Sequence, residues 1–226
     1  MRLLRAFAIY CLSTILLAAS AYAQQPVADK EYKLVQPPQP TQDPKKIEVL
    51  EFFSYACPHC ADFEPYLQDW LKRQSKDVEF RAVPMVFRDS WRPLAKLYYT
   101  MEAMGTLEKN HQKVFDAIHK QGQALFTDQA VIDWASKQGM DKAKFEQTYN
   151  SMGIENKVQR AIAMGRAYGI QFTPAMAVNG KYWTGPSMVA AGGAGPDMNR
   201  FFGVLDYLIN RERAAHTPAS PQQKRK

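Results

Sequence analysis

Cysteine and histidine are scarce in this chain of 226 residues, which has three of the first and four of the second. A structural disulfide framework uses several cysteines dispersed through an exported chain, and a zinc site needs four ligands. The histidines, His59, His111, His119 and His216, show no finger-like spacing. His111 and His119 would lie two helical turns apart, too far to share a metal easily, so we expect no metal site.

The chain also lacks a stripe of lysine and arginine interleaved with aromatic residues, in spite of a formal net charge of +7. Such a stripe is typical of surfaces that bind nucleic acid, so we expect no nucleic-acid partner. Part of the excess positive charge comes from the C-terminal tripeptide Lys224-Arg225-Lys226. A mild net charge bears on solubility and does not indicate a specific partner.

Long hydrophobic runs are confined to the N-terminus. Two arginines there precede an apolar stretch from Ala6 to Ala19, and Ala21-Tyr22-Ala23 fits the small-x-small pattern of a cleavage site. The stretch is shorter than the roughly 20 apolar residues of a membrane-spanning helix. We predict that residues 1–23 are a secretory signal peptide, whose removal takes Cys11 with it and leaves a protein that is not integral to the membrane.

The two remaining cysteines lie in the tetrapeptide Cys57-Pro58-His59-Cys60, where an apolar strand gives way to a helix. Three interpretations are open: a redox couple, a structural crosslink, or half of a metal site. Cysteines this close enclose a short loop, so a permanent crosslink would constrain little of the chain. The spacing at a helix start therefore favours disulfide exchange.

Position assigns a role to each residue of the tetrapeptide. Cys57 should lie at the exposed start of the helix, where unpaired N–H groups and the helix dipole favour a thiolate, so we expect it to attack. Cys60 lies about one turn inside and should resolve the mixed disulfide. His59 can add positive charge or a hydrogen-bond donor near Cys57, or it is only a solvated turn residue.

Two carboxyl groups near the cysteines are candidates for a proton relay. Glu51 interrupts an apolar strand six residues before Cys57. A buried carboxyl there would have a raised pKa and could exchange a proton with Cys60, whereas a partly exposed strand residue would not. Glu64 follows Cys60 by four residues and so shares its helical face, but it is equally well explained as a solvated side chain.

The residues around the tetrapeptide predict a β-α-β unit. A strand at Ile47–Phe53 is nearly all apolar, which indicates a central position covered on both sides. An amphipathic helix begins at the cysteine pair, with a kink expected at Pro65, and a second strand follows at 78–83. Such strands pair in parallel through a right-handed crossover.

Residues 91–169 are predicted to form an inserted helical subdomain. Apolar residues recur there at helical spacing in five segments, with no strand between them. Glycines and capping residues, such as Gly105, Gly139 and Thr127, punctuate the segments where helices should begin and end.

Residues 47–90 and 170–213 are predicted to form one α/β domain around this insertion. In the second part, Asn179-Gly180 separates two short apolar runs and indicates a type I′ hairpin, and residues 197–212 form a last helix. Residues 24–46 contain five prolines and are predicted to be an arm that resists compact structure, apart from a short strand at 32–35. Residues 214–226 are predicted to be a disordered basic tail.

The dipeptide Thr173-Pro174 lies at the entry to that second part. Sequence alone favours a trans bond, because only about 5–6% of X–Pro bonds in folded proteins are cis. The segment from Leu50 to Cys60, the pair Phe63-Glu64, Thr173-Pro174 and the segment Val178–Tyr182 together resemble the DsbA family of periplasmic thiol:disulfide oxidants. The resemblance covers most of the chain that remains after signal removal.

This resemblance implies a thioredoxin-like α/β fold with an inserted helical subdomain. It implies a cis-proline loop, Thr173-Pro174, that faces Cys57, Pro58, His59 and Cys60 and presents backbone to a bound substrate. The Cys57–Cys60 disulfide would be the only redox group, with no separate cofactor. It would pass to reduced, unfolded exported proteins in the periplasm, and a DsbB-like, quinone-linked membrane oxidase would restore it. We expect the protein to be a monomer.

The chain departs from the family pattern at Thr173, where members commonly have valine, and at Pro84 in the second strand. Two further functions stay open. One is a disulfide reductase or isomerase, although residues 24–46 are too short to supply a dimerisation domain. The other is a non-catalytic, peptide-binding chaperone with a surface around Met101, Met104 and Phe172, side chains that core packing explains equally well.

Overall fold

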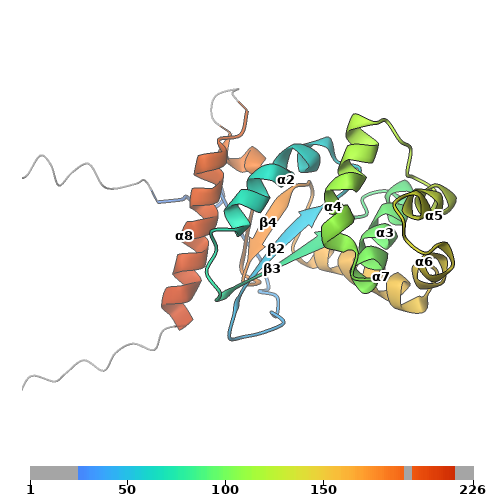
Figure 1. Ribbon diagram of the computed structural model, residues 1–226. Helices are drawn as coiled ribbons and strands as arrows, with labels where there is room; N and C mark the ends of the chain where they lie inside the picture. The colour runs from blue at the N-terminus through green and yellow to red at the C-terminus, as the bar shows by residue number, and fades with distance from the viewer. Residues whose placement is uncertain (1–24, 191–194, 217–226) are drawn as a thin grey trace, which may run out of the picture.

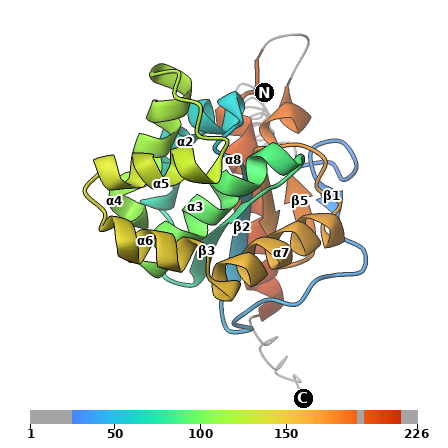
Figure 2. The ribbon, with the colours of Figure 1, turned by 90° about the vertical axis from the view of Figure 1, so that its right-hand side faces the viewer.

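The computed structural model describes residues 25–190 and 195–216 (Figure 1). The predicted signal peptide and most of the basic tail therefore lie outside the described residues. No helix in the described part of the chain has both the length and the apolar character needed to cross a bilayer. The molecule is an α/β fold in which a mixed sheet carries helices on both faces and a group of helices at one side (Figures 1 and 2).

The five strands of the described residues lie in the order β1-β5-β4-β2-β3. The central strand β2 (Ile47–Phe53) pairs in parallel with β3 (Val78–Pro84), as the β-α-β prediction requires. On its other side β2 pairs antiparallel with β4 (Ala175–Val178). The strands β5 (Tyr182–Thr184) and β1 (Lys33–Leu34) then complete the sheet, each antiparallel to its neighbour.

Alternate residues of β2 point to opposite faces of the sheet. Ile47 and Val49 pack with the helices α2 (Pro58–Leu71) and α8 (Met198–His216), while Leu50 and Phe52 pack with α7 (Met152–Ala167). Glu51 has the same parity as Ile47 and Val49. Its side chain therefore points to the face that α2 covers, beneath the helix that carries the cysteines.

The predicted helical insertion is present as five helices gathered on one side of the sheet (Figure 2). They are α3 (Arg92–Ala103), α4 (Leu107–Phe115), α5 (Asp128–Lys137), α6 (Lys142–Tyr149) and α7. A π-helical turn, Asp116–Lys120, extends α4. The predicted cap of α5 is Thr127, whose side chain accepts a hydrogen bond from the Ala130 N–H.

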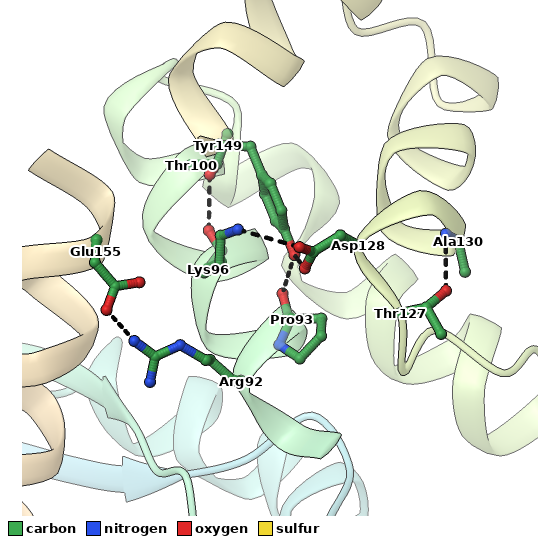
Figure 3. Close-up of polar contacts among 9 residues, drawn as sticks. All are labelled: Arg92, Pro93, Lys96, Thr100, Thr127, Asp128, Ala130, Tyr149 and Glu155. Atoms are coloured by element: carbon green, nitrogen blue, oxygen red, sulfur yellow. Dashed lines mark hydrogen bonds and ion pairs between the residues drawn. The ribbon is translucent and has the colours of Figure 1, made fainter. Parts of the chain in front are cut away.

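Polar contacts join the helices of the insertion (Figure 3). The Tyr149 hydroxyl of α6 donates to Asp128 at the start of α5, 2.6 Å away. Lys96 of α3 lies 3.5 Å from the same carboxylate, and its ammonium lies 3.8 Å from the centre of the Tyr149 ring. On the neighbouring side, Arg92 of α3 donates to Glu155 of α7. These contacts fix the insertion as one packed unit.

Residues 25–46 of the N-terminal arm are mostly exposed and have little regular structure, but the arm is held against the domain at several points. Tyr32 and Val35 are buried, and Lys33–Leu34 forms the predicted short strand at the sheet edge. Glu31 pairs with Arg200 of α8 at 2.5 Å, and its carbonyl accepts a hydrogen bond from the Thr184 hydroxyl. Strand pairing and these side-chain contacts outweigh the effect of the prolines.

The hairpin between β4 and β5 has the predicted turn. Asn179 and Gly180 have φ of 51° and 68°, as a type I′ turn requires, and the Lys181 N–H donates to the Val178 carbonyl. A Cβ on Gly180 would lie 1.9 Å from the Gln39 carbonyl oxygen of the arm. The glycine therefore permits both the turn and the close approach of the arm.

Helix α2 runs from Pro58 to Leu71 and includes Pro65, where the kink stays a prediction. Helix α8 continues to His216, so the predicted disorder is wrong for residues 214–216. Ala214 and Ala215 explain the extension, because alanine is the strongest helix former.

Candidate active site

The cysteine pair lies at the start of α2. Cys57 is the N-cap residue and has extended backbone angles, and Pro58 occupies the first turn, where a missing N–H costs nothing. The Cys57 N–H donates to the Ser54 carbonyl, and the Cys60 N–H donates to the Cys57 carbonyl. These bonds hold the two thiols on one tight turn.

Exposure differs along the tetrapeptide. Pro58 and His59 are exposed, whereas Cys57 is only 8% exposed and Cys60 is fully buried. The start of the helix is exposed, as expected, but the Cys57 side chain is more buried than expected. Part of the cover is Thr173, whose carbonyl oxygen lies 3.4 Å from the Cys57 sulfur.

The pKa values of the two thiols are shifted in opposite directions. A hydrogen bond from the Cys60 thiol, together with Thr173 and the backbone N–H groups of Cys60 and His59, lowers the pKa of Cys57 to about 5, against the effect of burial. Burial raises the pKa of Cys60, and hydrogen bonding to Cys57 and the Cys57 charge add to the rise. The low Cys57 pKa fits the sequence-based expectation, although the partner thiol contributes more than the helix backbone.

The Thr173–Pro174 peptide bond is cis, as the resemblance implies, and it lies against Cys57. A pocket of about 360 Å³ opens beside it. Its lining is mainly apolar and includes His59, Tyr66, Phe172, Thr173, Pro174 and Met198. His59 therefore borders a hollow next to the thiol, and its backbone N–H is the part that acts on Cys57.

Both candidate carboxyl groups are buried. Burial raises the pKa of Glu51 well above its usual range, and the charges of Glu64 and Cys57 raise it further. Burial pushes the pKa of Glu64 upward as well, but contacts with His111 and Gln68 outweigh this effect and keep it below the usual value. The solvated alternative for Glu64 is wrong, because only 4% of its side chain is exposed.

Two histidines of the insertion hold Tyr55, which precedes Cys57 by two residues. The Nδ1 atom of His111 lies 2.7 Å from the Tyr55 hydroxyl, and the Nε2 atom of His119 lies 2.8 Å from the Tyr55 carbonyl oxygen. His111 also places its Nε2 atom 3.6 Å from Glu64. The sequence gives no local sign that these histidines contact Tyr55, although their spacing of eight residues indicates a common helical face.

Comparison with known proteins agrees with this architecture. The family model described as Thioredoxin matches residues 44–218. The thiol:disulfide interchange protein DsbA of Bordetella parapertussis is 42% identical over 212 residues, which cover 94% of this chain and 96% of that protein.

Solved structures give the same result. The crystal structure of Pseudomonas aeruginosa DsbA has 38% sequence identity and a TM-score of 0.78, covering 85% of this chain and 97% of that one. The crystal structure of the oxidoreductase DsbA from Xylella fastidiosa has 33% identity and a TM-score of 0.75, covering 84% of this chain and 100% of that one. The chain therefore belongs to the thioredoxin-like DsbA family of thiol:disulfide interchange proteins and is a protein disulfide oxidoreductase.

Proposed function

We propose that this oxidoreductase works in the periplasm and donates its Cys57–Cys60 disulfide to reduced, folding exported proteins. The observation that carries the proposal is the contrast between the two thiols, one with a pKa of about 5 and the other fully buried with a raised pKa. A stabilised Cys57 thiolate favours the reduced form, and a pair whose reduced form is stabilised is a strong oxidant. This property favours an oxidase over a reductase or isomerase.

The transfer takes place in two displacements. A substrate thiolate attacks the Cys57 sulfur, the Cys57–Cys60 bond breaks, and Cys60 leaves with the electron pair. A second substrate thiolate then attacks the substrate sulfur of the mixed disulfide, and Cys57 leaves as a stable thiolate. The substrate dithiol loses two electrons and the cysteine pair gains them. When the pair is reoxidised, Cys57 is the attacking thiolate and Cys60 the resolving one.

The buried Cys60 needs a proton when it leaves. Glu51 lies beneath α2 and has a raised pKa, so it keeps a proton that it can give to the Cys60 thiolate. Glu64, close enough for its charge to act on Glu51, is the second member of this relay. Reoxidation needs the reverse transfer, from the Cys60 thiol to Glu51.

The apolar pocket beside the thiol is the proposed substrate site. Thr173 and Pro174 would present backbone to an extended peptide, and His59, which follows the exposed Pro58, also lines the pocket. A DsbB-like membrane oxidase, linked to quinone, would use the same side to remove the two electrons. The predicted signal peptide and the DsbA resemblance support the location and this partner, and we expect the protein to act as a monomer.

The chaperone alternative has less support. Met101 is fully buried and Met104 and Phe172 are partly buried in the core clusters. The two methionines therefore pack against the core, and Phe172 belongs to the pocket beside Cys57 and not to a separate apolar surface.

The test is oxidation of a reduced peptide with two cysteines, in the wild-type protein and in Cys57→Ser. We expect stoichiometric peptide oxidation by the wild type and none by the variant. A redox titration against glutathione gives the direction of transfer. A pair that stays oxidised at reducing glutathione ratios would contradict the proposal, because it would be too weak an oxidant to donate its disulfide.

A further inference from the structure

His111 connects Tyr55, in the turn that leads to Cys57, with the buried carboxyl groups of Glu51 and Glu64. It comes from α4, in the insertion, and reaches Tyr55 with one ring nitrogen and Glu64 with the other, at 2.7 Å and 3.6 Å. Its side chain is 15% exposed, against 4% for Glu64. Glu51, Glu64 and His111 line one pocket of about 570 Å³. The imidazole is thus the most open member of a chain of groups that ends below Cys60.

Tyr55 favours one tautomer of a neutral His111 imidazole. Burial raises the pKa of Tyr55 well above its usual range, so its hydroxyl keeps its proton and can donate it to Nδ1, 2.7 Å away. The imidazole proton then lies on Nε2, the atom that faces Glu64. Whether neutral or charged, His111 therefore presents a donor to the Glu64 carboxylate.

The other charged and titratable groups around His111 do not offer Glu64 an equivalent partner. Tyr98 of α3 contacts the imidazole ring edge-on, and Glu102 and Glu108 line the same pocket with their negative charges. Arg81 of β3 also lines the pocket, but its guanidinium donates to Glu48 at 2.5 Å. Gln68 is the second donor to Glu64, at 2.7 Å, and it is neutral.

Two neighbouring buried carboxyl groups do not both ionise easily, because like charges repel strongly away from water. The pair therefore holds one proton, and its location depends on which member has the better donors. Glu64 has His111 and Gln68. Among the side-chain hydrogen bonds between described residues, none joins Glu51 to a donor that would favour its carboxylate.

We propose that His111 is the positioning residue that keeps the negative charge of this pair on Glu64 and thereby leaves the proton on Glu51, beside Cys60. The inference rests on the proposed function, since the proton is used when Cys60 leaves as a thiolate. In that step Glu51 gives its proton to the Cys60 sulfur and becomes a carboxylate, and a proton from water in the pocket restores it through the pair.

Two substitutions of one residue separate this role from a purely structural one. The amide of His111→Asn falls near the position of Nδ1 and keeps a partner for Tyr55, but it does not reach Glu64. The longer His111→Gln reaches Glu64 with a neutral donor. A structural role predicts that the asparagine variant is tolerated, whereas the proposed role predicts that it is the worse of the two.

The first measurement is a titration of the glutamate carboxyl groups by ¹³C NMR, in the reduced wild-type protein and the variants. In His111→Asn we expect the Glu64 signal to titrate at higher pH than in the wild type and the Glu51 signal at lower pH, with His111→Gln in between. Unchanged titration midpoints of the two signals in His111→Asn would overturn the proposal. This readout needs no catalytic activity, so it stands even if peptide oxidation, and with it the proposed function, fails.

The second measurement is the rate at which a peptide with one cysteine forms a mixed disulfide with the oxidised protein between pH 5 and 8. Acid quenching and mass spectrometry follow the product. We expect His111→Asn to lower the rate at pH 7 by about tenfold, because general acid catalysis depends on the protonated donor. His119→Asn is the matched control: it removes a contact with Tyr55 and leaves Glu64 alone, so its rate should stay within about twofold of the wild type.

A double variant tests the route of the effect. In a Glu64→Gln background the carboxylate that His111 is proposed to hold is gone, so adding His111→Asn should change the rate little. Equal losses in His111→Asn and His119→Asn would overturn the proposal, since they would trace the effect to Tyr55. A full additional tenfold loss in the Glu64→Gln background would overturn it as well, because the imidazole would then act elsewhere.

Discussion

The start of helix α2 lies between two unlike regions. On one side, Cys57 contacts Thr173 and adjoins an apolar pocket of about 360 Å³ that opens next to exposed residues of the turn. On the other side, Glu51 lies beneath the helix and, with Glu64 of the helix itself, lines a pocket of about 570 Å³ that also contains Arg81 and His111. We call them the sulfur side and the proton side.

The difference between the two sides follows from what each sulfur must do. A sulfur that is attacked by a large substrate must be reachable and must leave as a stable anion, which Cys57 does with its low pKa. The sulfur that is displaced inward, Cys60, is fully buried, so it cannot take a proton from bulk water. In the proposed mechanism its proton comes from inside the protein, and the proposed donor is Glu51, whose charge acts on Cys60.

The largest expected effect separates the two cysteines themselves. Cys60→Ser should lose all catalytic turnover yet still form a mixed disulfide with a peptide disulfide, because the Cys57 thiolate remains. Cys57→Ser should form no adduct at all, since Cys60 is buried and its pKa is raised. Mass spectrometry under acid conditions measures both. Similar adduct yields in the two variants would show that the two cysteines do not differ in reactivity, and would contradict the distinction between the two sides.

The next effect concerns the proton side alone. Glu51→Gln keeps the size of the side chain and removes its exchangeable acid proton, so Cys60 leaves without a donor. We expect mixed-disulfide formation at pH 7 to slow by about 10- to 100-fold, up to the lower bound of the usual range for general acid catalysis. The alkylation midpoint of Cys57 should move only slightly, because Glu51 has a raised pKa and is therefore uncharged where Cys57 titrates.

The matched control for that variant is Glu79→Gln, a substitution of a partly buried residue on β3 that lines neither pocket. It should leave the rate unchanged. Equal rates in Glu51→Gln and the wild type across pH 5–8 would remove Glu51 from the relay.

Much of the scaffold could be predicted from the sequence, because its signals are local. The nearly continuous apolar character of Ile47–Phe53 predicts a central strand, and Asn179-Gly180 predicts a turn whose two residues must both have positive φ. The cysteine pair and its helix start are likewise contiguous. The five helices of the insertion follow from apolar spacing and from capping residues such as Thr127.

The proton side could be predicted only in part. Sequence spacing places Glu64 on the face of Cys60, but it does not show that α4, more than 40 residues later, covers that face and brings His111 against it. The packing of the arm was missed for the same reason: Glu31 meets Arg200 from 169 positions away. Contacts of this kind depend on how elements pack, which a single sequence does not encode in any local pattern.

A third effect tests the sulfur side through stability. Cys57 has a pKa of about 5 in the reduced fold, while an unfolded thiol titrates near 8.5. Between these values the folded protein has released a proton that the unfolded chain still binds, so the stability of the reduced form rises with pH. The gain is fully present above the unfolded pKa and is lost as the pH falls through about 5.

The oxidised form has no Cys57 thiolate and provides the comparison. Glu51 acts in the opposite direction, because its raised pKa reduces stability as the pH rises, but it is present in both forms. Urea denaturation of both forms should show the reduced form gaining about 1–3 kcal/mol over the oxidised form from pH 5 to pH 8, after allowance for partial solvent screening. In the reduced Cys57→Ser protein this gain should vanish. If it persists, another group stabilises the reduced fold.

The smallest expected effect comes from Thr173, where the DsbA resemblance implies valine. Thr173→Val keeps the shape of the side chain and the carbonyl oxygen that lies 3.4 Å from the Cys57 sulfur, and it removes only the hydroxyl. That side chain contributes less to the low Cys57 pKa than the Cys60 thiol does. We expect about a threefold change in the equilibrium with glutathione toward a weaker oxidant, which corresponds to about 15 mV.

Thr173→Val also tests whether the two sides act independently. It should raise the alkylation midpoint of Cys57 slightly and leave the pH profile of mixed-disulfide formation unchanged in shape, because that profile reports the acid beside Cys60. Glu51→Gln should show the reverse pattern, a changed profile with little change at Cys57. Thr173→Val could instead alter the pH profile as strongly as Glu51→Gln does. In that case the sulfur side and the proton side are one coupled site. The burial of Cys60 would then not separate its proton donor from the substrate pocket.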